Sequence, residues 1–295
     1  MFAGDPFDNK FCNYEKGKNE DKRRGSYGVV YKAELNGEIF AIKKLRVGKV
    51  EMKYLKREID ALIKLENCEN IVKYHQIWFT NKEGINLQFS TDCYKLNEDK
   101  KRIDVQTENG EIVTFTPVLL YIVMEYCERN LENIIHCITD KERKNYFRQI
   151  LNGLKSLGVC GIVHRDLKPN NIFIDSNNVV KIGDFGWALH KEALTPSDLT
   201  EGRGCKEFRA PEIYDCDEIA SMDITGIVDV YSFGLIYFLM CLKRKVEKKE
   251  LCILTEILRT YRFYYKENYN LSIEDRVLLS RMLAKDPKMR ITINE

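Results

Sequence analysis

The chain has 295 residues, of which 44% are hydrophobic and 31% are charged, a balance typical of a globular protein with a buried core. Its 47 basic and 45 acidic residues leave a formal net charge of +2, which favours neither nucleic acid nor a membrane surface as a partner. Ten cysteines lack the CxxC and CxxH spacings of zinc sites, so we expect reduced thiols in a cytoplasmic or nuclear protein. The longest apolar run, residues 233–242, is too short to span a membrane and predicts a buried core helix.

The first part of the chain predicts a leader, a hairpin and a helix. Residues 1–22 are polar and charged, and we expect a flexible leader there. Residues 24–33 and 39–45 are rich in β-formers and flank an Asn-Gly turn, which predicts a hairpin. Residues 52–66 have apolar side chains at helical spacing.

A long segment separates two further predicted strands, at residues 70–79 and 119–126. The segment, from about residue 80 to 118, is unusually long for a loop inside a compact domain. Apolar residues alternate at 85–89 and at 112–115, so we interpret the segment as an insert with one extra hairpin; partial disorder is the alternative.

The second part of the chain predicts mainly helices. Residues 140–157 carry one apolar stripe, and we expect Asp140 to cap this helix and Gly158 to end it. Further helices are expected at residues 248–261 and 273–284.

Residues 164–186 contain side chains that suit metal and phosphate chemistry. Asp166 could accept a proton from an attacking hydroxyl, and Lys168 could balance charge on a transferring phosphate. The amide of Asn171 and the carboxylate of Asp184 supply hard oxygen ligands for magnesium. Short apolar runs between these two residues predict a hairpin that brings Asp184 back beside Asn171.

The order of the motifs resembles that of the eukaryotic-type protein kinases. The chain carries a catalytic loop, HRDLKPNN, a magnesium motif, DFG, and an activation-segment end, APE, at residues 210–212. The resemblance covers about residues 24–293 and implies an α+β, bilobal protein kinase fold. We expect a small, mainly antiparallel β N-lobe with one helix at residues 23–126, and a larger, mainly α C-lobe with a truncated C-terminal end at residues 127–295.

The resemblance implies ATP and Mg²⁺ as cofactors. Lys43 would reach the ATP phosphates and pair with a helix glutamate, for which Glu58 is expected because it lies beside apolar Ile59; a solvated helix face is the alternative. Lys44 is the rival lysine, but strand alternation puts it on the opposite face from Lys43 and Ala41.

The glycine loop and the hinge supply the other nucleotide contacts that the resemblance implies. Gly25 and Gly28 would let backbone amides approach phosphate, although Arg23 replaces the family's first glycine and an ordinary hairpin is the alternative. The expected contacts around adenine come from Val30, Ala41, the gatekeeper Met124, and the hinge residues Glu125 and Cys127.

Residues 187–209 resemble a mobile activation segment. The candidate phosphosites are Thr195, Ser197 and Thr200. Thr200 lies where related kinases carry an activating threonine, with Arg165 as its expected partner, and a plain surface threonine is the alternative.

Four further positions in the C-lobe can be compared with those of the family. Cys205 replaces a threonine that contacts the catalytic aspartate and lysine, and a thiol is a weaker donor. By resemblance, Asp229 would anchor the catalytic-loop backbone and Arg290 would pair with Glu212.

We interpret the chain as a serine/threonine kinase that acts on a protein. The strings IVKYHQIWF and LYIVMEYC, with the insert between them, resemble the kinases that phosphorylate the α-subunit of translation initiation factor 2, which implies that substrate. Kinases of the mitotic inhibitory group share part of the strings, and homodimer formation stays open. The alternative is a pseudokinase that scaffolds a partner, supported by Arg23 and Cys205. The apolar stripe of residues 248–261 is either a docking surface or core.

Overall fold

The computed structural model describes residues 22–24, 28–48, 50–88, 94–97, 102–106, 111–190, 204–214, 226–260, 269 and 271–295. Gly25 and the candidate phosphosites Thr195, Ser197 and Thr200 lie outside the described residues. Within these ranges, none of the helices combines the length and the apolar character that crossing a membrane requires.

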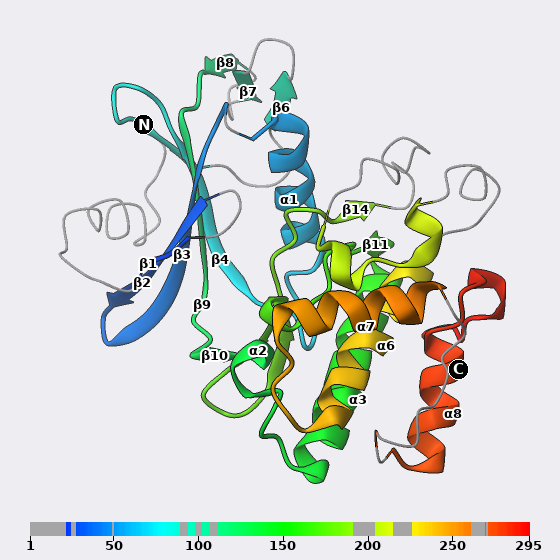
Figure 1. Cartoon of the computed structure of the whole chain (residues 1–295). Helices are drawn as coiled ribbons and strands as arrows, with labels where there is room; N and C mark the ends of the chain where they lie inside the picture. Colours follow the sequence, from blue (N-terminus) through cyan, green and yellow to red (C-terminus); the bar gives the residue numbers. More distant parts are fainter. Residues whose placement is uncertain are drawn as a thin grey trace. The chain divides into compact units, whose positions relative to one another are not determined.

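The chain divides into two compact units. One contains Met1–Ile59 and Lys73–Tyr126, and the other contains Asp60–Val72 and Cys127–Glu295. The first unit is built mainly from antiparallel strands, and most of the helices belong to the second (Figure 1). This is the α+β organisation that the sequence predicts.

A six-stranded antiparallel sheet forms the first unit, in the order β1-β2-β3-β9-β4-β5. Asn36 and Gly37 join β2 to β3 with φ values of 53° and 83°, as a two-residue hairpin turn requires. Helix α1 buries Leu55, Ile59 and Leu62. The bounds are β1 Lys22–Arg24, β2 Gly28–Leu35, β3 Glu38–Arg46, β4 Tyr74–Thr80, β5 Asn86–Gln88, β9 Leu119–Glu125 and α1 Met52–Lys64.

The insert differs from the single hairpin that the sequence analysis expects. Strand β5 pairs with β4 and extends the main sheet. A separate sheet has the order β6-β7-β8, and its strands are Tyr94–Asn97, Arg102–Gln106 and Ile112–Phe115. The predicted pairing of 85–89 with 112–115 is therefore wrong. Strand β7 was missed because its sequence, RIDVQ, is mostly polar, although Ile103 within it is fully buried.

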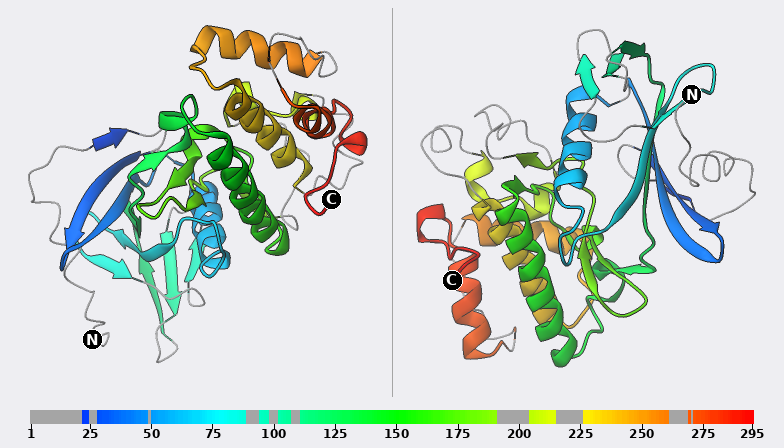
Figure 2. Two further views of the ribbon diagram at one scale, coloured as in Figure 1. Left: turned by 90° about the horizontal axis from the view of Figure 1, so that it is seen from below. Right: turned by 180° about the vertical axis from the view of Figure 1, so that it is seen from behind.

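The second unit is organised around α6, in which every residue from Val228 to Cys241 is buried, as predicted for its apolar run. Helix α3 lies beside α6 (Figure 2). The helices are α2 Leu131–Ile134, α3 Asp140–Val159, α6 Ile227–Leu242, α7 Lys248–Thr260 and α8 Ile273–Met282. The strands are β10 Arg129–Asn130, β11 Ile162–Val163, β12 Ile172–Ile174, β13 Val180–Ile182 and β14 Leu189–His190. Short 3-10 helices are η2 Pro169–Asn171, η4 Lys206–Phe208, η5 Pro211–Tyr214 and η7 Pro287–Met289.

Two helix predictions are corrected. The N-cap of α3 is Thr139, not Asp140, because Thr139 and Glu142 form a reciprocal capping box that satisfies two backbone amides. Gly158 lies inside this helix, which ends at Val159. In α7, Thr255 and Leu258 of the predicted stripe are buried and the helix contacts η4, whereas Leu251 and Leu254 are half-buried.

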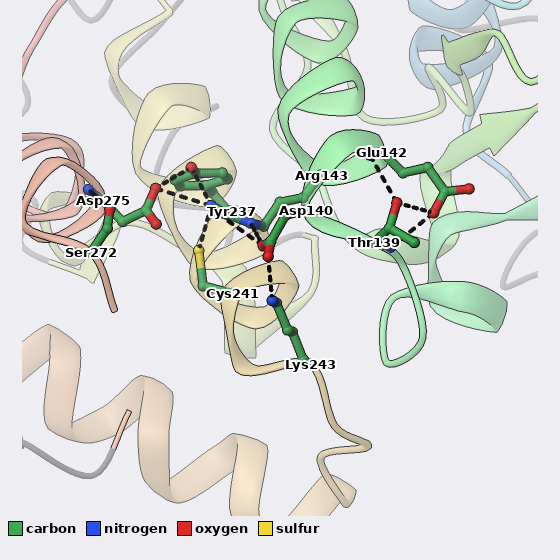
Figure 3. A network of polar contacts seen from close by, with 9 residues as sticks. All are labelled: Thr139, Asp140, Glu142, Arg143, Tyr237, Cys241, Lys243, Ser272 and Asp275. Carbon is green, nitrogen blue, oxygen red and sulfur yellow. Dashed lines mark hydrogen bonds and ion pairs between the residues drawn. The ribbon is translucent and has the colours of Figure 1, made fainter. Parts of the chain in front are cut away.

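A polar network ties α3, α6 and α8 together (Figure 3). The Arg143 guanidinium donates to Asp275 Oδ1 at 3.0 Å and to the Tyr237 hydroxyl at 2.6 Å. The Tyr237 hydroxyl in turn donates to Asp275 Oδ1 at 2.5 Å. Burial alone would raise the pKa of Asp275, but the hydrogen bonds from Tyr237 and Arg143 outweigh it and hold that pKa below its usual value. The carboxylate is therefore ionised where the three helices meet.

We expect Asp275→Ala to lower the free energy of unfolding by about 3 kcal/mol, because the Arg143 guanidinium would be left with the mostly exposed carboxylate of Asp140, and the buried Tyr237 hydroxyl would lose its acceptor. Urea denaturation followed by circular dichroism measures this. The matched control on the same helix is Arg281→Ala, which removes a half-exposed ion pair with Glu295 and should cost less than about 1 kcal/mol.

The contribution of Asp275 also depends on pH. Because its folded pKa is depressed, the stabilisation is present above the unfolded value of about 4 and is lost as the pH falls through the folded pKa. Equal losses of stability in the two variants at pH 7 would contradict this role of the network.

Candidate active site

A buried carboxylate holds the backbone that leads into the catalytic loop. Asp229, on α6, is 2% exposed and accepts hydrogen bonds from the backbone amides of His164 at 2.7 Å and Arg165 at 2.9 Å. Burial raises the pKa of Asp229, while the two amides act in the opposite direction. Arg165 has a φ of 67°, which is unfavourable for a residue with a side chain, so this anchor holds a strained backbone in place.

His164 ties the same loop to the start of the magnesium motif. Its Nδ1 accepts from the Asp166 amide at 3.3 Å, which assigns the proton to Nε2 and lets Nε2 donate to the Gly183 carbonyl at 3.1 Å. The ring lies 5.1 Å from that of Phe185. This histidine is fully buried, and the sequence analysis did not single it out.

The carboxylate of Asp166 is fixed by three donors. Lys168 Nζ lies 2.6 Å and Asn171 Nδ2 lies 3.1 Å from its Oδ2, while the backbone amide of Cys205 lies 2.8 Å from its Oδ1. Asp166 is only 4% exposed. Three of the sequence-predicted residues, Asp166, Lys168 and Asn171, are therefore brought together.

The predicted hairpin places Asp184 next to Asn171 along the backbone. Strands β12 and β13 pair in antiparallel register with Ile172 opposite Ile182, and the Gly183 amide donates to the Asn171 carbonyl at 3.0 Å. Asp184 follows with a φ of 64° and an exposed side chain. Because the Asn171 Nδ2 donates to Asp166, a cation would bind its Oδ1.

The oxygen donors of Asn171 and Asp184 suit magnesium better than a metal whose ligands all come from protein side chains. In the described ranges, no group of three or more His, Cys, Asp or Glu side chains could hold a metal. Magnesium is commonly bound by one or two protein oxygens, with substrate phosphates and water completing the octahedron. Asn171 Oδ1 and the Asp184 carboxylate could supply two oxygens of this kind.

Cys205 contacts the Asp166 carboxylate through its main chain, not its side chain. Its thiol donates to Glu207 Oε2 at 3.0 Å, and burial, followed by the neighbouring Glu207, raises the pKa of the thiol to about 11. The preceding Gly204 has a φ of 85°, and a Cβ there would lie 2.6 Å from the Arg165 carbonyl oxygen. The sequence analysis did not single out Gly204, although this glycine directly precedes Cys205.

In the first unit, Lys43 Nζ and Glu58 Oε1 form an ion pair of 2.5 Å. Both side chains are largely buried, at 12% and 7% exposure. Lys44 instead lies over the Tyr121 ring, 5.2 Å from its centroid. The two lysines therefore occupy opposite faces, and the expected pairing of Lys43 with Glu58 is present.

The sheet register puts the predicted adenine-site residues of this unit on the face of Lys43. Val30 lies opposite Lys43, and Ala41 lies opposite Met124, so their side chains project to one side. The Glu125 amide donates to the Lys73 carbonyl at 2.9 Å. The Glu125 amide is therefore already engaged within the sheet unit. Cys127, in the other unit, is half-buried.

Gly28 has a structural reason to be glycine that is separate from phosphate binding. A Cβ at this position would lie 2.3 Å from the Lys44 carbonyl oxygen, so β2 and β3 approach too closely for any side chain. This observation supports the hairpin alternative for Gly28.

The end of the activation segment is held by a second buried ion pair. Arg290 Nη1 and Nη2 donate to the two carboxylate oxygens of Glu212 at 2.6 and 2.9 Å. Both side chains are almost completely buried. This two-pronged contact, expected from the sequence, fixes the short helix η5 that follows the loop carrying Cys205.

Comparison with known proteins agrees with this geometry. The protein kinase domain family matches residues 23–295. The eIF-2-alpha kinase GCN2 of Arabidopsis thaliana is 31% identical over 245 residues, which cover 73% of this chain and 19% of the relative. Its namesake in Schizosaccharomyces pombe is 36% identical over 192 residues, 60% of this chain and 11% of the relative. The interferon-induced, double-stranded RNA-activated protein kinase of Rattus norvegicus is 29% identical over 286 residues, 94% of this chain and 50% of the relative.

This chain spans at most half the length of these three relatives. The family match nevertheless covers nearly all of the chain, and the two-unit α+β fold is the one that the motifs predict. The chain therefore belongs to the protein kinase domain family, a family of phosphotransferases, and is similar to its serine/threonine-specific members.

Proposed function

We propose that this domain transfers the γ-phosphate of ATP to a serine or threonine hydroxyl of a protein. The observation that carries the proposal is the arrangement around Asp166, whose carboxylate is held by Lys168, Asn171 and the Cys205 amide. Catalysis of phosphoryl transfer consists mainly of positioning and charge stabilisation, and a carboxylate with fixed neighbours suits that task.

Each of these groups has a separate role in the proposed reaction. Asp166 accepts the proton of the substrate hydroxyl as the hydroxyl oxygen attacks phosphorus. Lys168, whose Nζ lies 2.6 Å from the carboxylate, balances negative charge on the transferring group. Asn171 orients Asp166 through its amide nitrogen and leaves its amide oxygen for a cation.

Further residues bind the nucleotide in this proposal. Lys43, kept in position by Glu58, binds the α- and β-phosphates. Asn171 and Asp184 bind Mg²⁺, which when present neutralises charge on the phosphates. Val30, Ala41 and Met124 provide an apolar contact for adenine, and backbone groups of Glu125 and Cys127 bind its polar edge. Gly25 would let a backbone amide approach the phosphates, as the resemblance implies, whereas the close approach of β2 and β3 gives Gly28 a structural role.

We further propose that the substrate is the α-subunit of translation initiation factor 2. Two of the relatives described above are named as kinases of that protein, and the strings IVKYHQIWF and LYIVMEYC carry the resemblance in this chain. The described cysteines are all free thiols, which supports a reducing compartment such as the cytoplasm. A pseudokinase remains the competing function, supported by Arg23 and Cys205.

For the proposed function, the first prediction distinguishes the roles of the two neighbouring lysines of β3. Lys43→Met should lower kcat/KM for ATP-dependent transfer by about 100-fold, because Glu58 would lose its partner and the phosphates their cation. Lys44→Met changes a lysine that lies over the Tyr121 ring on the opposite face of the strand and should change the rate less than about threefold. Radiolabel transfer from ATP to a protein substrate measures both. Equal losses would mean that Lys43 does not bind ATP.

The second prediction concerns the main-chain contact to Asp166. Gly204→Ala should lower kcat by about tenfold or more, because the positive φ and the close Arg165 carbonyl force the Cys205 amide away from the carboxylate. Cys205→Ala keeps the amide and should stay within about threefold of the unchanged protein. Circular dichroism shows whether both variants fold. A larger loss for Cys205→Ala would show that the thiol is required.

The third prediction tests the substrate. The purified domain, ATP and magnesium are incubated separately with the purified α-subunit and with a generic basic protein, and the modified residues are located by mass spectrometry. We expect phosphate on a serine of the α-subunit at a rate at least about tenfold above the basic protein. Phosphate on the basic protein alone would discard the substrate and keep the kinase. Transfer to neither, with ATP still bound, would favour the pseudokinase.

A further inference from the structure

Two cysteine thiols that the proposed chemistry does not use lie against each other in the second unit. The Sγ atoms of Cys68 and Cys160 are 3.7 Å apart, although the residues are separated by 92 positions in the sequence. Cys68 lies in the turn after α1, and Cys160 is the C-cap of α3. Both side chains are only partly buried, so small oxidants can reach them.

The surrounding backbone holds the two thiols together. The Ser156 hydroxyl donates to the Glu69 carbonyl at 3.3 Å, one residue from Cys68. At Gly153, an added Cβ would lie 2.9 Å from the Asn70 carbonyl oxygen, so the turn packs closely on α3. The Cys160 thiol also lies 3.5 Å from the Lys64 carbonyl, the last residue of α1. Three contacts other than the thiol pair therefore fix the distance between the two chain segments.

We propose that Cys68 and Cys160 are an oxidisable dithiol. A small-molecule disulfide, such as glutathione disulfide, or a peroxide oxidises the two thiols to an intrachain disulfide. A disulfide needs the sulfur atoms to move from 3.7 Å to about 2.05 Å, which side-chain rotation can supply once the backbone is in place. With glutathione disulfide as the oxidant, the thiolate of one cysteine attacks a sulfur of glutathione disulfide, forms a mixed disulfide and releases one glutathione. The thiolate of the other cysteine then attacks the cysteine sulfur of the mixed disulfide and releases the second glutathione. The protein loses two protons and two electrons, and one glutathione disulfide becomes two thiols.

The local chemistry makes this pair slow to react. Burial, and then the neighbouring Cys160, raises the pKa of Cys68 to about 11, so little thiolate is present at neutral pH. The pair therefore responds to a sustained oxidising potential more than to a brief exposure. Once formed, the bond would join the end of α1 to the end of α3, two residues before β11 and four before His164.

Equilibration of the purified chain in glutathione buffers of increasing oxidising potential tests the proposal. Digestion with trypsin places Cys68 in the peptide of residues 65–73 and Cys160 in that of residues 156–165, each with a single cysteine. We expect these two peptides to be recovered as one disulfide-linked species under oxidising buffer and separately after reduction. We also expect the oxidised chain to melt roughly 5 °C higher, because the cross-link restricts the unfolded chain.

Matched variants separate this pair from the other cysteines. Cys68→Ser with Cys160→Ser should abolish the linked species and the rise in melting temperature. Cys137→Ser with Cys252→Ser, which changes two exposed cysteines, should leave both unchanged. Recovery of the two peptides only as reduced or singly glutathionylated species would overturn the proposal, as would cross-links confined to other cysteines. A linked species without any change in melting temperature would overturn the stabilising role.

Discussion

The structure of the second unit depends on one buried carboxylate, that of Asp229. Its two oxygens hold the amides of His164 and Arg165, and through them the strained backbone that presents Asp166. A buried carboxylate without partners is costly, but two short amide contacts offset its loss of water. Because Asp229 belongs to a helix buried on all sides, the anchor cannot shift without disturbing the core. The catalytic loop is thus positioned by the core helix and not by its own few contacts.

Buried charged groups with fixed partners also hold other parts of the structure that the proposed reaction requires. Lys43 is held by Glu58 at low exposure, and η5, after the Cys205 loop, by the two-pronged contact of Glu212 with Arg290. In each case a flexible charged side chain is fixed by an opposite charge away from water, where the interaction is screened little. If one partner is replaced, the other is left as a buried unpaired charge. A substitution at either residue therefore removes the stabilisation of the whole pair. Half-exposed pairs such as Arg281 with Glu295 carry no such constraint.

Much of this arrangement could be predicted from sequence, because the motifs concentrate it in short segments. The hairpin between Asn171 and Asp184 and the buried core helix follow from short apolar runs. The choice of Lys43 over Lys44 follows from the resemblance to the kinase family together with strand alternation. The strand pairing within the insert could not be predicted, since β7 is mostly polar and the pairing of strands is not encoded locally. The contact of the Cys205 amide with Asp166 could not be predicted either. The sequence shows that a cysteine replaces the family's threonine, but it does not show the hydrogen bond made by the backbone amide of that residue.

The central claim is that Asp166, with its fixed neighbours, serves phosphoryl transfer. The most direct measurement is single-turnover transfer of labelled γ-phosphate to a protein substrate by the unchanged domain and by Asp166→Asn, with nucleotide affinity measured in parallel. The account predicts that Asp166→Asn binds ATP and magnesium normally but transfers phosphate at least about 100-fold more slowly. Equal rates of transfer by the two proteins would contradict it.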